Sequence, residues 1–99
     1  MTEQTESQIQ SKIIEYLELN RFLVFRLNSG KARHNIRLCP NGTPDLLAIS
    51  RHGSVWWIEV KKPGGKVSTE QWEMINKLKA RGHNVIVAYS VMDVQTNLK

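Results

Sequence analysis

Two acidic residues and a lysine lie where packing alone does not require them. Asp45 opens an otherwise apolar run at 46–49, and Glu59 lies inside a second apolar run at 55–60 that Lys61 follows. Side chains alternate along a strand, so Glu59 and Lys61 share one face. Turn chemistry would also explain Asp45. A salt bridge on the solvent face of an edge strand would also explain Glu59 and Lys61.

The two carboxylates become informative when they are considered together. A hairpin turn at 51–54 joins their strands, and pairing across it runs Asp45 level with about Val60, close to Glu59. Buried like charges repel, so such a pair takes up a proton or recruits a cation. Lys61 neutralises only one charge. A divalent cation bound only by oxygen atoms, Mg²⁺ or Mn²⁺, would neutralise the remaining negative charge.

A metal held by carboxylates beside a lysine is suited to phosphodiester hydrolysis, because the metal activates water and polarises the phosphate. Lys61 would steady the developing negative charge. Gln71, on a helix expected at 69–81, faces the sheet and joins this group, although a capping box with Ser68 explains it about as well. Glu6 lies on the inward side of the first helix, where compensation of the helix dipole is the simpler explanation.

The elements that must position these residues follow from hydrophobic periodicity and from capping and turn signals. The strand before the helix at 69–81 and the strand after it form a right-handed βαβ crossover, while the hairpin makes part of the sheet antiparallel. We expect one α/β domain over residues 1–99, with a mixed β-sheet flanked by helices. The expected elements are a helix at 5–20, strands at 22–27, 45–50 and 55–61, the helix at 69–81, a strand at 85–89 and a short C-terminal helix at 91–97.

Composition restricts the class of protein. The chain has 99 residues, of which 40% are apolar, enough for one compact core. No apolar run is long enough to span a bilayer, and the polar, acidic start has no signal-peptide pattern. Cys39 is the only cysteine, which excludes an internal disulfide and favours a reducing, cytoplasmic setting.

The basic residues favour a polyanionic partner, and we expect DNA. Lys and Arg number 14 against 9 Asp and Glu, a net charge of +5. The stretch 26–37 contains no acid, and its polar groups can hold phosphates without reading sequence. A solvated basic loop is the simpler explanation in isolation, but the adjacent hydrolytic site favours DNA. The residues expected to bind DNA are Arg26, Asn28, Ser29, Lys31, Arg33 and Arg37, with Lys62 and Lys66 extending the same surface.

Motifs spread over nearly the whole chain resemble the viral replication and repair nuclease (VRR-NUC) domain of the PD-(D/E)xK nuclease superfamily. In chain order they are Glu6-x-x-Ile9-Gln10, Arg26-Leu27-Asn28-Ser29-Gly30, Gly42-Thr43-Pro44-Asp45-Leu46, Ile58-Glu59-Val60-Lys61 and Val67-Ser68-x-x-Gln71. The resemblance implies a restriction-endonuclease-like fold and a metal-dependent DNA endonuclease. It implies that the metal ligands are Glu6, Asp45, Glu59 and the backbone carbonyl of Val60. It also implies that Lys61 is the catalytic lysine and that Gln71 is an active-site residue.

Small standalone, virus-type members of this group resemble homodimeric Holliday-junction resolvases. The expected protein is therefore a homodimer that cuts branched DNA in the cytoplasm of a bacterial or virus-infected cell. Two alternatives stay open: a restriction or repair endonuclease acting on linear duplex, and a basic DNA-binding subunit whose site is inactive or structural. A nucleotide or phosphoprotein hydrolase is disfavoured because no glycine-rich phosphate loop is present.

Overall fold

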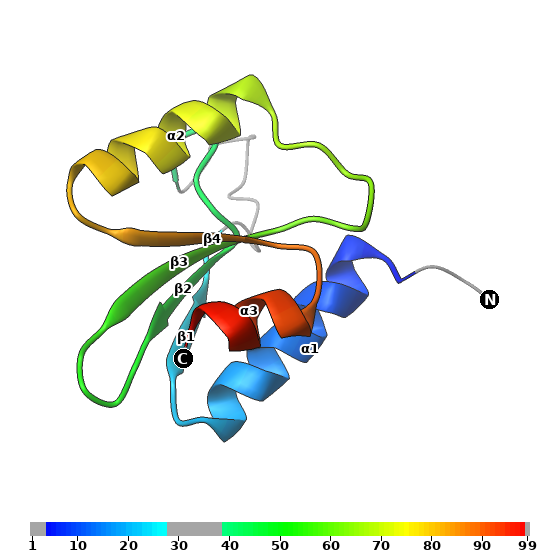
Figure 1. Cartoon of the computed structure of the whole chain (residues 1–99), viewed down its shortest axis with the longest axis vertical. Helices are drawn as coiled ribbons and strands as arrows, with labels where there is room; N and C mark the ends of the chain where they lie inside the picture. The colour runs from blue at the N-terminus through cyan, green and yellow to red at the C-terminus, as the bar shows by residue number, and fades with distance from the viewer. Residues whose placement is uncertain (1–3, 28–38, 99) are drawn as a thin grey trace, which may run out of the picture.

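The computed structural model describes residues 4–27 and 39–98. Their elements lie close to the ranges expected from the sequence. In chain order (Figure 1) they are α1 (Glu6–Leu19), β1 (Leu23–Arg26), β2 (Leu46–Ile49), β3 (Val55–Val60), α2 (Thr69–Ala80), β4 (Asn84–Ala88) and α3 (Val91–Asn97). Within the described ranges, no helix has both the length and the apolar character needed to cross a membrane.

Each helix begins where the sequence predicts a cap. Thr5 and Gln8 form a capping box at α1, in which Gln8 N donates to Thr5 Oγ1 at 3.1 Å and Thr5 N donates to Gln8 Oε1 at 2.9 Å. Ser68 and Gln71 form the same box at α2, and the side chain of Ser90 caps α3. These bonds satisfy amide groups that a helix leaves unpaired in its first turn.

The sheet is mixed, as the sequence predicts. Its strand order is β1-β2-β3-β4, with antiparallel pairing of β1 to β2 and of β2 to β3, and parallel pairing of β3 to β4. The segment β3-α2-β4 therefore connects two neighbouring parallel strands, as the expected crossover requires. The α/β class and the mixed sheet are confirmed.

The register of the hairpin differs by one residue from our expectation. Leu46 pairs with Ile58, and continuing this register by one residue places Asp45 opposite Glu59 rather than opposite Val60. Residues directly opposite each other on antiparallel strands share a face. The observed register therefore brings the two acidic side chains closer together than the expected one.

The turn between β2 and β3 explains this register. Ser50 N donates to the carbonyl of Ser54 at 2.8 Å, and Ser54 N donates back to the side-chain hydroxyl of Ser50 at 2.9 Å. Closing the turn between these two serines makes Ile49 pair with Val55. The expected register, which runs Asp45 level with Val60, would instead pair Ser50 with Val55.

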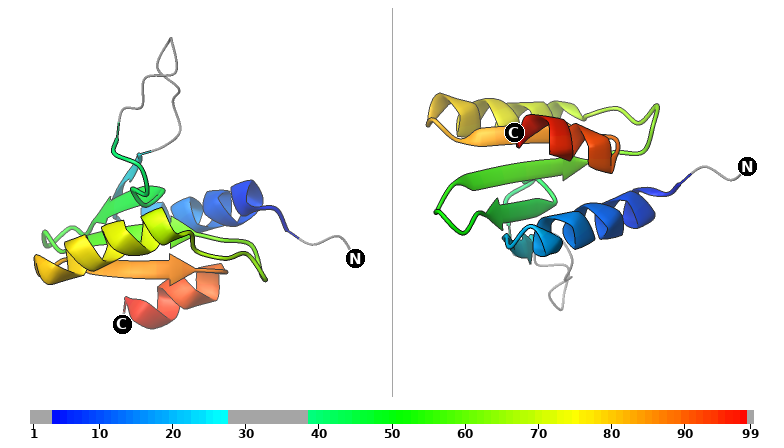
Figure 2. Two further views of the ribbon diagram at one scale, coloured as in Figure 1. Left: turned by 90° about the horizontal axis from the view of Figure 1, so that it is seen from above. Right: turned by 60° about the horizontal axis from the view of Figure 1, so that its bottom comes forward.

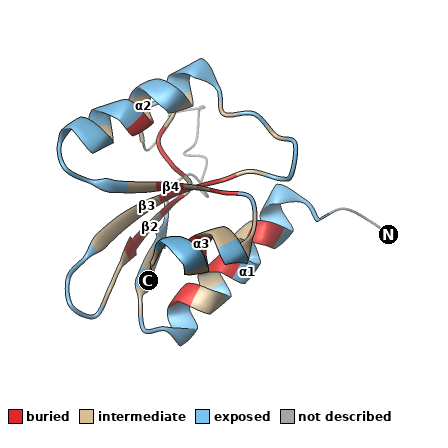
Figure 3. Ribbon diagram, in the orientation of Figure 1, coloured by how far each residue is buried: buried red, intermediate tan, exposed pale blue. Residues whose placement is uncertain are grey.

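Helices cover both faces of the sheet, with α1 and α3 on one face and α2 on the other (Figure 1). Ile9, Ile13 and Leu17 recur at helical spacing and are buried against the sheet (Figure 3). Burial of each such side chain contributes about 1.5–3 kcal/mol. The buried residues that complete this core are Leu46, Ala48, Ile58, Val60, Ile86, Ala88 and Val94.

The α2 face of the sheet holds the chemistry. Because strand residues alternate, Glu59 and Lys61 point away from the core formed by Ile58 and Val60 and toward the side covered by α2. Ile75 is the buried residue of α2 on that side. Glu59 thus lies between the sheet and the first turn of α2, where Gln71 contacts it, and Lys61 lies beside it on the same face.

Candidate active site

A turn followed by two buried residues, Thr43 and Pro44, delivers Asp45 to the beginning of β2. The hydroxyl of Thr43 donates to the carbonyl of Pro40 at 2.6 Å, and Thr43 is buried. Asp45 then bridges two strands: its carbonyl accepts from Leu27 N at 2.8 Å, and its Oδ2 accepts from Val60 N at 2.8 Å. The carboxylate is thereby fixed beside the end of β3. The bond from Val60 N was not foreseen in the sequence, because it depends on the register.

Glu59 is the acidic side chain at the centre of the site. It is 2% exposed. Its Oε2 accepts a hydrogen bond from Gln71 Nε2 at 3.1 Å and lies 3.9 Å from Lys61 Nζ. Its Oε1 is buried and has no hydrogen-bond partner among the described residues. A buried oxygen without a donor is costly, so this atom requires a proton, a water molecule or a cation.

The surroundings of Glu59 favour its protonated form in the metal-free protein. Burial is the largest cause that raises the pKa of its carboxyl group from 4.5 to about 8. Asp45 adds to this rise through its negative charge and through a hydrogen bond that forms only when Glu59 carries the proton. Lys61 lowers the pKa and Glu6 raises it, both by smaller amounts. At neutral pH the carboxyl group of Glu59 therefore binds a proton. A cation at the buried Oε1 would satisfy the same oxygen.

Gln71 serves the helix cap and the site at once. Its Oε1 accepts from Ser68 N at 2.8 Å, which completes the capping box. The same bond turns Nε2 toward Glu59, where it donates to Oε2. The sequence left the cap and the active site as two alternatives for Gln71, and the structure contains both contacts.

Glu6 lies at the rim of the site and is exposed. Our expectation that this side chain points inward is wrong, because the first turn of α1 extends past the ends of the strands (Figure 2). With Gln4, Thr5 and Lys62 it lines a surface hollow. Its charge nevertheless contributes to the raised pKa of Glu59. Helix periodicity predicts which side of α1 carries Glu6, but it does not predict where the sheet beneath that side ends.

The donor set fits a hard divalent cation. Asp45 and Glu59 supply carboxylate oxygens, one of them the buried Oε1 without a partner, and such oxygens suit Mg²⁺ or Mn²⁺. The side chain of Val60 is packed in the core, so only its backbone is available to the site. Over residues 4–27 and 39–98, no group of three or more Asp, Glu, His or Cys residues is placed to hold a metal together. The close pair of carboxylates is therefore the part of the predicted ligand set that the structure brings together.

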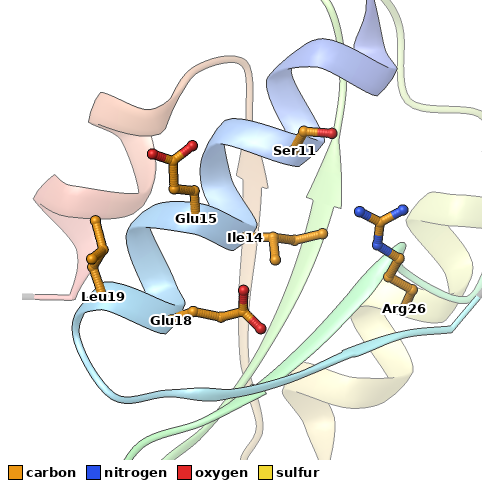
Figure 4. A pocket seen from close by; sticks show the side chains of 6 residues that line it. All are labelled: Ser11, Ile14, Glu15, Glu18, Leu19 and Arg26. Carbon is orange, nitrogen blue, oxygen red and sulfur yellow. The ribbon is translucent and has the colours of Figure 1, made fainter.

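The predicted DNA-binding residues are distributed over more than one face. Lys62 and Lys66 are exposed on the loop that follows β3 and Lys61. Arg26 pairs with the core residue Leu46 and so lies on the α1 face. There it lines a hollow with α1 residues, including Ser11, Ile14 and Glu18 (Figure 4). The other predicted residues, Asn28, Ser29, Lys31, Arg33 and Arg37, lie outside the described residues.

The comparisons with known proteins agree with this arrangement. The sequence model of the VRR-NUC domain matches residues 4–92. A solved structure described as a VRR-NUC domain is 30% identical, and the alignment covers 96% of this chain and 96% of that chain with a TM-score of 0.76. Among curated proteins the comparison finds no match.

The fold and the match to this domain place the chain in a nuclease family. The chain belongs to the VRR-NUC domain family. The resemblance inferred from the motifs is confirmed, and so is the α/β architecture that it implied.

Proposed function

We propose that this protein is a Mg²⁺- or Mn²⁺-dependent endodeoxyribonuclease that hydrolyses phosphodiester bonds in branched DNA, in the manner of a Holliday-junction resolvase. The observation that carries the proposal is the environment of Glu59. This buried carboxyl group lies beside Asp45, its Oε2 is 3.9 Å from Lys61 Nζ, and its Oε1 has no partner in the described part of the chain. Carboxyl groups whose pKa is strongly perturbed by burial and by a charged neighbour are typical of functional sites.

The proposed metal ligands are Glu6, Asp45, Glu59 and the carbonyl of Val60. When bound, the cation supplies Lewis-acid polarisation of the phosphate and a lower pKa for water. Binding of a cation would require Glu59 to give up the proton that its raised pKa favours at neutral pH, and the positive charge would offset the repulsion between Glu59 and Asp45. Glu6 is the exposed member of this set, and its charge already acts on Glu59.

The remaining side chains of the site orient Glu59 or neutralise negative charge on the phosphates of the DNA. Lys61 places its ammonium group beside Glu59 and would stabilise negative charge that develops on the phosphate. Gln71 holds Glu59 Oε2, so that the carboxyl group keeps one orientation. Lys62 and Lys66, exposed on the loop that follows Lys61, neutralise backbone phosphates next to the site.

We further propose a homodimer that acts in the cytoplasm. One site cuts one strand, and a symmetric branch point suits two sites related by a twofold axis. The cytoplasmic setting rests on the single cysteine in the sequence.

Two alternatives make different demands on the same residues. A restriction or repair endonuclease would use the same site on linear duplex. A basic DNA-binding subunit would need no metal, and one observation favours it: the raised pKa of Glu59 lets the metal-free site hold a proton, while Gln71 and Lys61 satisfy Oε2.

The test compares a labelled four-way junction with linear duplex of the same sequence, in Mg²⁺, in Mn²⁺ and in EDTA. We expect paired, metal-dependent nicks in the junction that disappear in Lys61→Ala. The matched control is Lys62→Ala, which removes the neighbouring exposed lysine. Equal cutting of both DNAs would contradict specificity for the junction and would favour an endonuclease that acts on linear duplex. Tight binding without cutting in either metal would favour the binding subunit.

A further inference from the structure

Gly42 makes an unusually close backbone contact that joins two distant parts of the chain. Its φ is +84°, in the left-handed region that favours glycine. A Cβ added there would overlap the carbonyl oxygen of Glu70 and would lie 2.7 Å from its carbonyl carbon and 3.1 Å from Gln71 N. These atoms belong to the backbone, so no side chain can rotate away. The turn before β2 therefore abuts the first turn of α2.

The two segments in contact hold Glu59 from two sides. On one side, Gly42 is the third residue of the turn from Pro40 to Thr43, which leads to Asp45 beside the end of β3. On the other side, Glu70 directly precedes Gln71, whose amide donates to Glu59. The distance between these segments decides whether Asp45 and Gln71 engage the same carboxyl group.

We infer that Gly42 is a positioning residue for the active site. Its missing side chain lets the first turn of α2 approach the turn before β2 closely enough for Gln71 to reach Glu59. A displacement of about 1 Å would break the hydrogen bond, which is 3.1 Å long. Misplacing a catalytic group by that amount costs about 10²-fold in rate. The contact between Gly42 and α2 rests on geometry alone. Its expected effect on the rate rests on the proposed nuclease function.

Gly82 provides a matched control at the opposite end of α2. Its φ is +82°, and a Cβ added there would meet nothing within 4 Å. Gly82→Ala thus introduces the same left-handed backbone strain as Gly42→Ala without the collision. Gly53, with φ +91° and open space around it, is a second control in the β2–β3 turn. Any effect seen in Gly42→Ala but not in the two control variants therefore reports the close contact between Gly42 and the backbone of α2.

The first readout is independent of metal and DNA. The side-chain NH₂ signals of Gln71 are recorded by NMR in the metal-free protein and assigned by their loss in Gln71→Glu. We expect Gly42→Ala to shift these signals and Gly82→Ala to leave them in place. In the junction-cleavage assay, Gly42→Ala should lower kcat about 10²-fold with little change in KM, whereas Gly82→Ala should stay within about threefold of the parent protein.

Gln71 signals that do not move in Gly42→Ala, together with a kcat equal to that of Gly82→Ala, would overturn the inference. If the parent protein cuts no DNA, the nuclease proposal fails and the NMR comparison still decides the role of Gly42. If Gly42→Ala does not fold, folding itself becomes the readout, because Gly42→Ala, Gly53→Ala and Gly82→Ala all introduce left-handed backbone strain and only the first introduces the collision. Loss of folding in Gly42→Ala alone would support the close contact. Equal loss of folding in all three variants would overturn the inference, because strain alone would then explain it.

Discussion

Gln71 Nε2 donates a hydrogen bond of 3.1 Å to Glu59 Oε2, while the amide oxygen of the same side chain caps α2. The helix cap therefore determines which end of the amide faces the buried acid. A capping box is normally a local device for helix stability. Here it also orients a donor toward a carboxyl group from another element.

The dual role of Gln71 gives the first prediction. Gln71→Ala should lower stability by about 0.5–1 kcal/mol through the lost cap and lower cleavage about 10–100-fold through the lost contact with Glu59. Gln8→Ala is the matched control, because Gln8 occupies the same capping-box position at α1 without touching the site. Urea unfolding and the junction-cleavage assay measure the two effects. Equal cleavage by the two variants would assign Gln71 to the helix cap alone.

Lys61 and Lys62 should differ sharply although they are neighbours. Lys61→Ala should reduce cleavage by about 10²–10³-fold, and it should raise the pKa of Glu59 further, because Lys61 lowers it. Lys62→Ala should mainly weaken DNA binding and flatten its salt dependence. Cleavage kinetics and carboxyl NMR titration of the metal-free protein separate the two roles. Similar losses of cleavage in both variants would contradict the specific role of Lys61.

The buried carboxyl group predicts how stability changes with pH. The pKa of Glu59 is raised from 4.5 to about 8 in the folded protein, so its contribution is full below pH 4.5 and is lost as the pH rises through about 8. Within this window the free energy of unfolding should fall by up to about 1.4 kcal/mol per pH unit relative to Glu59→Gln. Urea unfolding of both proteins in EDTA measures the difference. Parallel pH profiles would show that Glu59 ionises normally.

Glu6 tests how far the predicted ligand set extends. Because Glu6 is exposed at the start of α1, Glu6→Gln should change stability by less than about 1 kcal/mol. If Glu6 is a ligand, Mn²⁺ affinity and cleavage should both fall about tenfold or more. Glu15→Gln, at another exposed position of α1, should change neither property. An unchanged Mn²⁺ affinity in Glu6→Gln would show that Glu6 is not a metal ligand and that it only compensates the helix dipole.

Local signals in the sequence were sufficient for the elements and their caps. The capping pairs Thr5 with Gln8 and Ser68 with Gln71 span three residues each, so periodicity and residue type define them. Strand alternation likewise put Glu59 on the same face as Lys61. The mixed sheet was predictable from the hairpin turn and the βαβ crossover, and the VRR-NUC family from the resemblance of five motifs along the chain.

Features that depend on distant contacts were not predictable. The register of β2 and β3 accompanies a turn that closes through two hydrogen bonds between Ser50 and Ser54. The exposure of Glu6 depends on where the sheet ends, and helix periodicity carries no information about that. The contact between Gly42 and Glu70 joins segments whose separation only the folded chain defines.

The most direct test of the central claim is a calorimetric titration of the metal-free protein with Mn²⁺ at pH 7, in two buffers of different ionisation enthalpy. The central claim is that Asp45 and Glu59 exchange a proton for a metal ion. Since the pKa of Glu59 is about 8, binding should release nearly one proton at pH 7, and this release should fade as the pH rises above 8. Binding should be lost in Glu59→Gln. Absence of Mn²⁺ binding, or binding that releases no proton and survives Glu59→Gln, would contradict the account.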